Sequence, residues 1–237
     1  MNYFLTLNWI FYAMKAMILS AGFGTRLRHL TENLPKALVS YKGIPMIKYQ
    51  IERLINAGAD EIIVNAHHRS GMISSYFDSN DFGVKISVIT ENEILGTGGG
   101  ILNAGKYFKD EKFFTVINAD IDTDIDLKQV ISFHISNAPF ATLVVQKRIS
   151  KRYLEFDSDM KLAGRENDSS DKDNLFAFNG IHIISAEIFK KGFEVKYRDI
   201  LDIYFEVLQN DKSGKIFVKG FDAGNSLFKD LGKLENL

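Results

Sequence analysis

Strand-like and helix-like patterns alternate from residue 16 to residue 146, and this alternation restricts the fold more than any other feature. Short apolar runs typical of buried strands alternate with stretches in which apolar residues recur every three or four positions, as in helices. The strand patterns lie at 16–19, 61–66, 84–89, 113–117 and 141–146, and the helix patterns lie at 45–57, 71–77, 98–108 and 127–136. Such an alternation predicts a three-layer α/β/α sandwich with a mixed, mainly parallel sheet.

The regular pattern ends near Lys147. The segment 165–174 is polar and acidic and predicts an exposed loop. Beyond it, we expect a strand at 176–184, a helix at 198–208 and a short strand at 215–219. Because the chain has 237 residues and a composition typical of globular proteins, one large domain over 14–237 accounts for it.

The first thirteen residues are apolar and carry no charged side chain. They lack the basic region and the small-residue cleavage site of a secretory signal, and the run is too short to cross a bilayer. A strand pattern then begins next to Met14. We therefore expect 1–13 to be an upstream extension, with Met14 as the true start and no membrane anchor.

Charge and cysteine content exclude several classes of function. The formal net charge is −1, so the chain as a whole has no attraction for nucleic acid or for a membrane surface. It has no cysteine, which excludes disulfides, thiolate nucleophiles and cysteine-based zinc sites, and which fits a reducing cytoplasm. Any anionic substrate must therefore be bound by locally placed basic groups.

A glycine loop follows the first strand pattern and carries the strongest chemical signal. It reads GFGTRL at 22–27, and LPKAL follows at 34–38. Glycine lets backbone N–H groups approach phosphate oxygens, while Arg26 and Lys36 supply the positive charge that a triphosphate requires. We predict that the nucleotide is bound by Ala21, Gly22, Gly24, Thr25 and Arg26.

Two common phosphate-binding motifs do not match this loop. A dinucleotide fingerprint requires a third glycine where Leu27 stands, and a P-loop requires Gly-Lys followed by Ser or Thr. A tight strand-to-helix turn with two solvated cations is the purely structural alternative.

Two further segments carry candidate site residues. LGTGGG at 95–100 opens a helix, and a helix N-terminus favours anions and close ligand approach. Gly98 and Gly99 are therefore candidates for the nucleotide site, with a flexible loop before a helix as the alternative. Asp120 follows an apolar strand and can hold a metal ion at the sheet edge. The later aspartates of this run, at 122, 124 and 126, exceed the needs of one metal, and one of them is expected to cap the next helix.

These motifs together resemble the sugar nucleotidyltransferase family. That family has a glycine loop with Thr-Arg-Leu/Met followed by Pro-Lys-Pro-Leu; here Ala37 replaces the second proline, and the phosphate-contacting Lys36 is kept. FKDLGKL at 228–234 resembles a late family segment whose aspartate is the second metal ligand. The resemblance implies a Rossmann-like fold with Mg²⁺ held by Asp120 and Asp230, a nucleotide-binding part over about 14–146, and a sugar-binding part over about 147–237.

Weaker features lie near the predicted site. FNGI at 178–181 resembles a sugar-contacting strand of the family, so Asn179 and Gly180 are candidates for sugar binding, with core packing as the alternative. His67 and His68 follow a strand, but neighbouring strand residues face opposite ways, which disfavours a shared metal. We expect them to be polar groups at the end of a strand.

The resemblance implies transfer of a nucleoside monophosphate from an NTP to a sugar 1-phosphate, with release of pyrophosphate. Arg26 would stabilise the leaving pyrophosphate, and Lys36 would hold phosphate at the reacting centre. UTP with N-acetylmuramate 1-phosphate is the first expectation for the substrates. A mannose-1-phosphate guanylyltransferase, a D-x-D glycosyltransferase and a non-catalytic binding module are the alternatives. We expect a cytoplasmic monomer or small homo-oligomer with no nucleic-acid or membrane partner.

Overall fold

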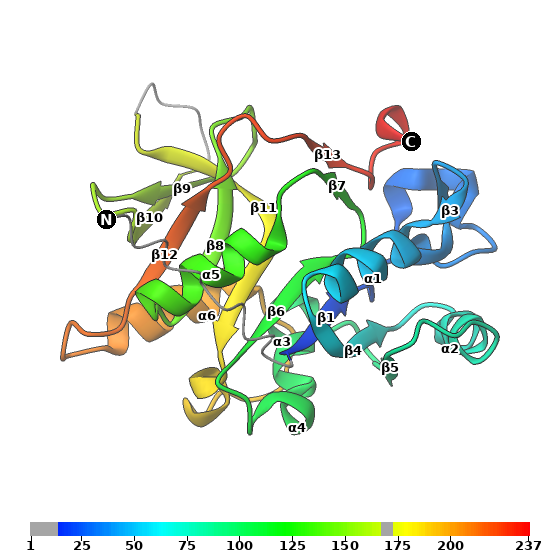
Figure 1. The fold of residues 1–237 in the computed structure, drawn as a ribbon, viewed down its shortest axis with the longest axis horizontal. Helices are drawn as coiled ribbons and strands as arrows, with labels where there is room; N and C mark the ends of the chain where they lie inside the picture. Colours follow the sequence, from blue (N-terminus) through cyan, green and yellow to red (C-terminus); the bar gives the residue numbers. More distant parts are fainter. Residues whose placement is uncertain (1–13, 167–172) are drawn as a thin grey trace, which may run out of the picture.

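The computed structural model describes residues 14–166 and 173–237, so the expected upstream extension and most of the expected polar loop lie outside the described residues. Within them, one nine-stranded mixed sheet forms the centre of the molecule (Figure 1). Its main path runs β10-β9-β11-β6-β1-β4-β5, and β8 pairs with both β11 and β12. The strands are β1 (Met14–Leu19), β4 (Ala59–Ala66), β5 (Lys85–Thr90), β6 (Phe113–Asn118), β8 (Ala141–Gln146), β9 (Tyr153–Phe156), β10 (Leu162–Glu166), β11 (Leu175–Ser185) and β12 (Val218–Asp222).

The first half of the chain builds the parallel part of the sheet. Strand β1 lies between β4 and β6 and runs parallel to both, while β5 extends the same parallel set. Strand β11 then joins antiparallel to β6, which adds the strands of the second half to the same sheet. Because β1, β4 and β6 are parallel, their carboxyl ends meet at one edge, where ligands bind in such sheets.

Helices cover both faces of the sheet, as the alternation of patterns predicts (Figure 1). Neighbouring residues of β1 point to opposite faces: Ile18 packs in the core with α1, α2 and α5, and Met17 packs in the core with α3, α4 and α6. Burial of one such side chain stabilises the fold by about 1.5–3 kcal/mol. The helices are α1 (Met46–Asn56), α2 (Ser70–Asp78), α3 (Gly96–Asn103), α4 (Gly105–Phe108), α5 (Leu127–Asn137) and α6 (Ile200–Asn210).

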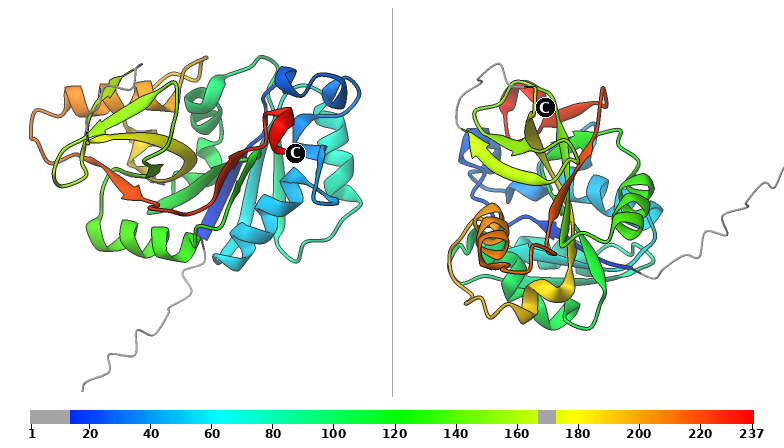
Figure 2. Two further views of the ribbon diagram at one scale, coloured as in Figure 1. Left: turned by 90° about the horizontal axis from the view of Figure 1, so that it is seen from above. Right: turned by 90° about the vertical axis from the view of Figure 1, so that its left-hand side faces the viewer.

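Short elements complete the described chain. Strand β7 (Ile121–Thr123) pairs with β13 (Phe228–Asp230), and β2 (Ser40–Tyr41) pairs with β3 (Ile44–Pro45). Figure 2 shows the C-terminal segment that contains β13 running back toward the N-terminal third of the chain. Among the described residues, no helix has the length and apolar character that crossing a membrane requires. The described part of the chain also contains four 3₁₀ helices, at Thr25–Thr31, Lys36–Leu38, Ala186–Lys190 and Leu234–Asn236.

The structure corrects several expected boundaries. The strand expected at 215–219 lies instead at Val218–Asp222, where it pairs with β8. The expected loop at 165–174 begins too early, because Arg165 and Glu166 end β10 and pair with β9. The single helix expected at 98–108 begins at Gly96 and is divided into α3 and α4 at Ala104.

The glycines of α3 allow close packing against the chain that leads into α6. A Cβ atom on Gly99 would lie 2.2 Å from the Lys196 carbonyl oxygen, and one on Gly98 would lie 2.9 Å from the Asp199 carbonyl oxygen. The Gly98 backbone N–H donates to the Arg198 carbonyl at 3.0 Å. The run of glycines therefore has a packing role, because any side chain there would push the two segments apart.

We expect Gly99→Ala to lower the free energy of unfolding by about 1–3 kcal/mol, the usual cost of overpacking, despite the better helix propensity of alanine. Urea unfolding followed by circular dichroism measures this change. The matched control is Gly71→Ala in α2, where an added Cβ meets nothing within 4 Å. We expect Gly71→Ala to leave the free energy of unfolding unchanged or to raise it. Equal stability of the Gly99→Ala variant and the unaltered protein would contradict the packing role.

Candidate active site

An open cleft of about 220 Å³ lies at the carboxyl edge of the parallel strands. The end of β1, the glycine loop, the end of β6 and the start of α3 all contribute to its walls. Two predicted nucleotide-binding residues and two predicted catalytic residues meet there. The lining includes Ala21, Gly22, Lys36, Thr97, Asn118 and Asp120.

The glycine loop folds back over the lysine that follows it. Gly24 has φ +68°, a left-handed conformation that favours glycine, and a Cβ there would lie 2.8 Å from the Lys36 Cβ. Gly22 has open space where a side chain would project. One glycine thus packs the loop against Lys36, and the other leaves room beside the cleft.

Buried hydrogen bonds fix the two walls of the cleft relative to each other. The Ser20 backbone N–H donates to Asn65 Oδ1 at 2.8 Å, and Asn65 Nδ2 donates to Glu91 Oε1 at 2.7 Å. Glu91 Oε2 in turn accepts the Leu95 backbone N–H at 3.2 Å. Asn65 and Glu91 are both buried. This chain of bonds links the start of the glycine loop to the start of α3.

Strand β13 brings the late aspartate beside the early one. Asp230 is opposite Ile121 in the antiparallel pair of β13 and β7, and the Leu231 N–H donates to the Asp120 carbonyl at 2.8 Å. Leu231 is fully buried in a small cluster with Leu27, Val39, Tyr41 and Met46. Asp120 and Asp230 are 110 residues apart in sequence, and this pairing is what joins them in space.

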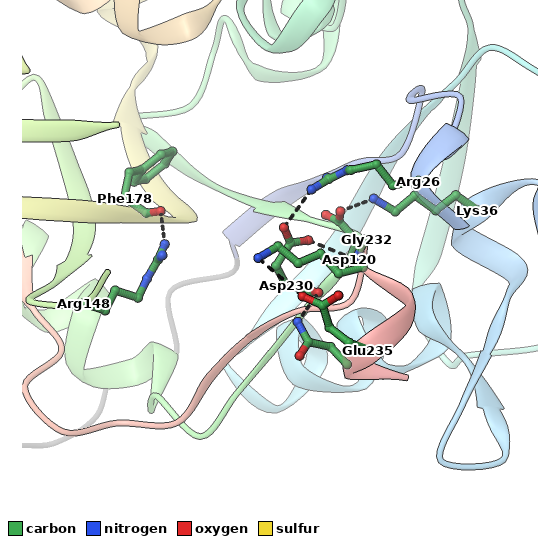
Figure 3. Close-up of polar contacts among 10 residues, drawn as sticks. Arg26, Lys36, Asp120, Arg148, Phe178, Asp230, Gly232 and Glu235 are labelled. Carbon is green, nitrogen blue, oxygen red and sulfur yellow. Dashed lines mark hydrogen bonds and ion pairs between the residues drawn. The ribbon is translucent and has the colours of Figure 1, made fainter. Parts of the chain in front are cut away.

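Four charged side chains converge around Gly232, as Figure 3 shows. Arg26 forms an ion pair with Asp230 at 3.0 Å, and Lys36 forms one with Asp120. A Cβ on Gly232 would lie within 2.8 Å of Arg26 Nη2, Lys36 Nζ and Asp120 Oδ2 alike. A side chain at this position would displace the ends of these three charged side chains, and the two cations of the site balance its two carboxylates.

The two carboxylates fit a magnesium site of the kind that substrate phosphates complete. Mg²⁺ is commonly bound through one or two carboxylates together with phosphate oxygens and water. Asp120 and Asp230 supply two carboxylates at one point, and Asp230 is 30% exposed. The described residues contain no group of three or more His, Asp or Glu side chains that could hold a metal by themselves. This donor set suits Mg²⁺ held jointly by protein and substrate.

A model of the family described as nucleotidyl transferase matches residues 15–159, which include the glycine loop, Lys36 and Asp120. The chain belongs to this family. The match confirms the resemblance predicted from the sequence, and it places the family segment on the parallel half of the sheet and the start of the second half.

Two curated relatives are named for the same activity. Mannose-1-phosphate guanyltransferase of Aspergillus oryzae is 40% identical over 137 residues, which are 56% of this chain and 38% of that protein. "Probable mannose-1-phosphate guanylyltransferase 2" of Arabidopsis thaliana is 33% identical over 222 residues, 88% of this chain and 60% of that protein. The chain thus spans less than two thirds of the length of these relatives.

A solved structure extends the likeness to nearly the whole chain. HddC from Yersinia pseudotuberculosis, in its complex with GMP-PN, superposes with a TM-score of 0.72 and 26% sequence identity. The superposition covers 94% of this chain and 96% of that chain. It confirms the predicted α/β fold.

Three predicted aspartates have structural roles within this family fold. Asp126 accepts the Lys128 N–H and is the N-cap of α5, as expected for one of the run, and Asp124 accepts the Leu227 N–H at 2.8 Å. Asp122 is buried and accepts hydrogen bonds from Tyr41 at 2.6 Å, Tyr49 at 2.7 Å and Lys42 at 3.0 Å. Asp122 therefore has its partners in the protein interior, two positions from Asp120.

The other residues predicted for the nucleotide site, and His67, lie near the cleft but differ in burial. Thr25 is exposed at the start of the 3₁₀ helix that carries Arg26, whereas Gly98 and Gly99 are buried, and Gly96 and Thr97 line the cleft in their place. Direct contact of Gly98 and Gly99 with a nucleotide stays a prediction. His67 Nδ1 donates to the Glu91 carbonyl oxygen at 2.8 Å, as expected for a polar group at a strand end.

The candidate sugar-binding residues lie on β11 beside the end of β6. Gly180 has φ +74°, and a Cβ there would lie 2.5 Å from Asn118 Nδ2. Asn179 is buried, and its Oδ1 accepts from Arg148 Nε at 3.0 Å. Their contact with a sugar stays a prediction. The sequence analysis missed Arg148, although its position just after a strand pattern is the same signal that identified Asp120.

We expect Asp122→Asn to lower the free energy of unfolding by about 3 kcal/mol, because it leaves buried donors without a charged acceptor. Thermal or urea unfolding measures the change. The matched control is Asp126→Asn, which keeps a good N-cap and stays within a few tenths of a kcal/mol, about the difference between the two residues as caps.

The pH dependence of this stabilisation follows from the same contacts. Burial opposes ionisation of Asp122, but the hydrogen bonds from Tyr41, Tyr49 and Lys42 prevail and lower its pKa below the ordinary 3.8. A lowered pKa stabilises the fold above pH 3.8, and the stabilisation is lost as the pH falls through the folded-state value. The difference in the free energy of unfolding between the unaltered protein and Asp122→Asn therefore becomes smaller below pH 3.8. A difference that does not change with pH would contradict this.

Proposed function

We propose that the protein transfers a nucleoside monophosphate from an NTP to a sugar 1-phosphate and releases pyrophosphate, with GTP and mannose 1-phosphate or a closely related sugar 1-phosphate as substrates. The observation that carries this proposal is the convergence of Arg26, Lys36, Asp120 and Asp230 around Gly232 at the sheet edge. Two cations and two carboxylates at one point suit a reaction in which phosphates and a divalent cation meet.

The reaction is a displacement at the α-phosphorus of the NTP. A phosphate oxygen of the sugar 1-phosphate is already anionic, so it attacks without a general base, and the bond from the α-phosphorus to pyrophosphate breaks. Catalysis then consists of positioning and charge neutralisation. Mg²⁺, when bound by Asp120 and Asp230, supplies charge neutralisation at the phosphates. Arg26 neutralises the leaving pyrophosphate, and Lys36 orients phosphate at the reacting centre.

The relatives favour a guanine nucleotide and a mannose-type sugar. The curated relatives are named for mannose 1-phosphate and guanylyl transfer, and the HddC structure contains GMP-PN, whose GMP part is a guanine nucleotide. These names support the mannose-1-phosphate guanylyltransferase alternative better than UTP with N-acetylmuramate 1-phosphate. We therefore replace the first expectation with that alternative.

A glycosyltransferase that uses a D-x-D metal motif agrees less well with the site. The second aspartate of that motif would be Asp122, which is 1% exposed and bonded to Tyr41, Tyr49 and Lys42. A glycosyltransferase also has no pyrophosphate to expel, which leaves Arg26 without a role in it. Nucleotidyl transfer uses both the pair of metal carboxylates and the cations of the glycine loop.

A screen of four NTPs against a panel of sugar 1-phosphates, read out as pyrophosphate release, tests the proposed function. We expect the highest kcat/KM with GTP and mannose 1-phosphate or a related sugar 1-phosphate. Activity is lost with EDTA and returns with Mg²⁺, because the substrate phosphates complete the metal site. A preference for UTP with N-acetylmuramate 1-phosphate would contradict the substrate assignment, and absence of pyrophosphate release with every pair would contradict the reaction.

Arg26→Ala tests the role of the glycine-loop cation. Negative charge builds on pyrophosphate as it leaves, so we expect kcat/KM to fall by about 10²–10³, the effect of removing one preorganised electrostatic donor. Arg26→Lys recovers only part of this, because an ammonium lacks the fork of a guanidinium. Pyrophosphorolysis of the product falls by the same factor, since both directions share one transition state. A fall of less than about tenfold in kcat/KM for Arg26→Ala would contradict this role.

A further inference from the structure

Arg148 is an arginine whose donors are only partly used. Its Nε donates to Asn179 Oδ1 at 3.0 Å and its Nη2 to the Phe178 carbonyl at 2.9 Å. Its guanidinium carbon lies 4.0 Å from the centroid of the Phe228 ring. A guanidinium has five N–H groups, so three of them have no protein partner within the described part of the chain. These contacts fix the plane of the guanidinium and leave one edge free.

The guanidinium of Arg148 has no ion-pair partner among the described residues. No carboxylate of residues 14–166 or 173–237 forms an ion pair with it, although its side chain is half-buried. Burial lowers its pKa, and the neighbouring charge of Asp230 acts in the opposite direction. A half-buried cation without a paired anion is costly, and an incoming anion would relieve that cost.

Arg148 lies on the opposite side of the metal carboxylates from the glycine loop. In Figure 3, Asp120 and Asp230 lie between Arg148 on one side and Arg26 and Lys36 on the other. Phe228, which packs against Arg148, is two residues before Asp230 on β13, so both side chains project from the same face of that strand. Arg148 therefore lies over the strand face that carries Asp230, on the β8 and β11 side of the metal carboxylates.

The charge balance of the site leaves a place for a third cation. Arg26 and Lys36 are matched by Asp230 and Asp120, so these four groups have no net charge. A triphosphate bound by the glycine loop uses Arg26 and Lys36. Arg148 is then available to a second phosphate that arrives as the nucleophile, because neither Asp120 nor Asp230 forms an ion pair with it.

We propose that Arg148 binds the phosphate of the sugar 1-phosphate and aligns it for attack. This inference rests on the proposed nucleotidyl transfer and adds a substrate-binding residue to it. A guanidinium binds two oxygens of one phosphate through parallel N–H groups, and the bonds to Asn179 and Phe178 hold its plane in advance. Asn179 thus acts on the sugar phosphate through Arg148, as a positioning residue.

Steady-state kinetics of Arg148→Gln tests the assignment. Loss of charged hydrogen bonds weakens binding by about 10–100-fold, so the KM for mannose 1-phosphate rises by that factor while the KM for GTP stays within about twofold. Arg148→Lys keeps the charge without the fork and gives an intermediate KM. The matched control is Lys147→Gln, which removes the same charge from an exposed neighbour and leaves both KM values unchanged. Equal rises in both KM values would overturn the assignment.

Binding measured without turnover separates this inference from the proposed function. Calorimetry with inorganic phosphate in the absence of metal gives binding to the protein and to Lys147→Gln, and at least about tenfold weaker binding to Arg148→Gln. Failure of the protein to bind phosphate, or equal binding by Arg148→Gln, overturns the assignment of Arg148 even if nucleotidyl transfer is observed. If Arg148→Gln loses phosphate binding but the unaltered protein shows no nucleotidyl transfer, the phosphate site is supported and the proposed reaction is rejected. Matching unfolding midpoints confirm that each variant is folded.

Discussion

The pairing of β13 with β7 is the interaction on which the site depends. Three residues of a late segment form an antiparallel ladder with three residues that follow β6, and the Leu231 N–H bonds to the carbonyl of Asp120 itself. The fully buried side chain of Leu231 anchors this contact beneath the glycine loop. A hydrophobic anchor and a backbone bond therefore set the distance between two carboxylates that would otherwise repel each other.

The ion pairs of the site contribute to geometry more than to stability. Arg26 is 58% exposed, and exposed pairs of this kind are worth about 0–1 kcal/mol. Asp122 stands in contrast, because it is buried and its three donors come from the segment around β2 and from α1. Two aspartates that are two positions apart thus have different roles. Asp120 lines the cleft, and Asp122 stabilises the fold behind it through its buried hydrogen bonds.

The sequence predicts the parts of the site that depend on local pattern. Asp120 and Lys36 could be identified because a buried strand or a glycine loop precedes each of them, and such positions meet at one edge of a parallel sheet. Asp230 required the resemblance to a family, since no local pattern reveals which strand β13 will join. The position of Arg148 just after a strand pattern is visible in the sequence, but its contact with Asn179 is not, because the two residues are distant in sequence. The packing role of Gly99 likewise depends on a distant residue, Lys196.

The order of the chain has a consequence for biosynthesis. The glycine loop, Lys36 and Asp120 emerge from the ribosome long before the segment that carries Leu231 and Gly232. Until that segment docks on β7, Asp120 lacks its neighbouring carboxylate and the small cluster around Leu27 lacks its central leucine. The pair of carboxylates is therefore incomplete in a nascent chain from the appearance of Asp120 until the late segment has been made and has docked.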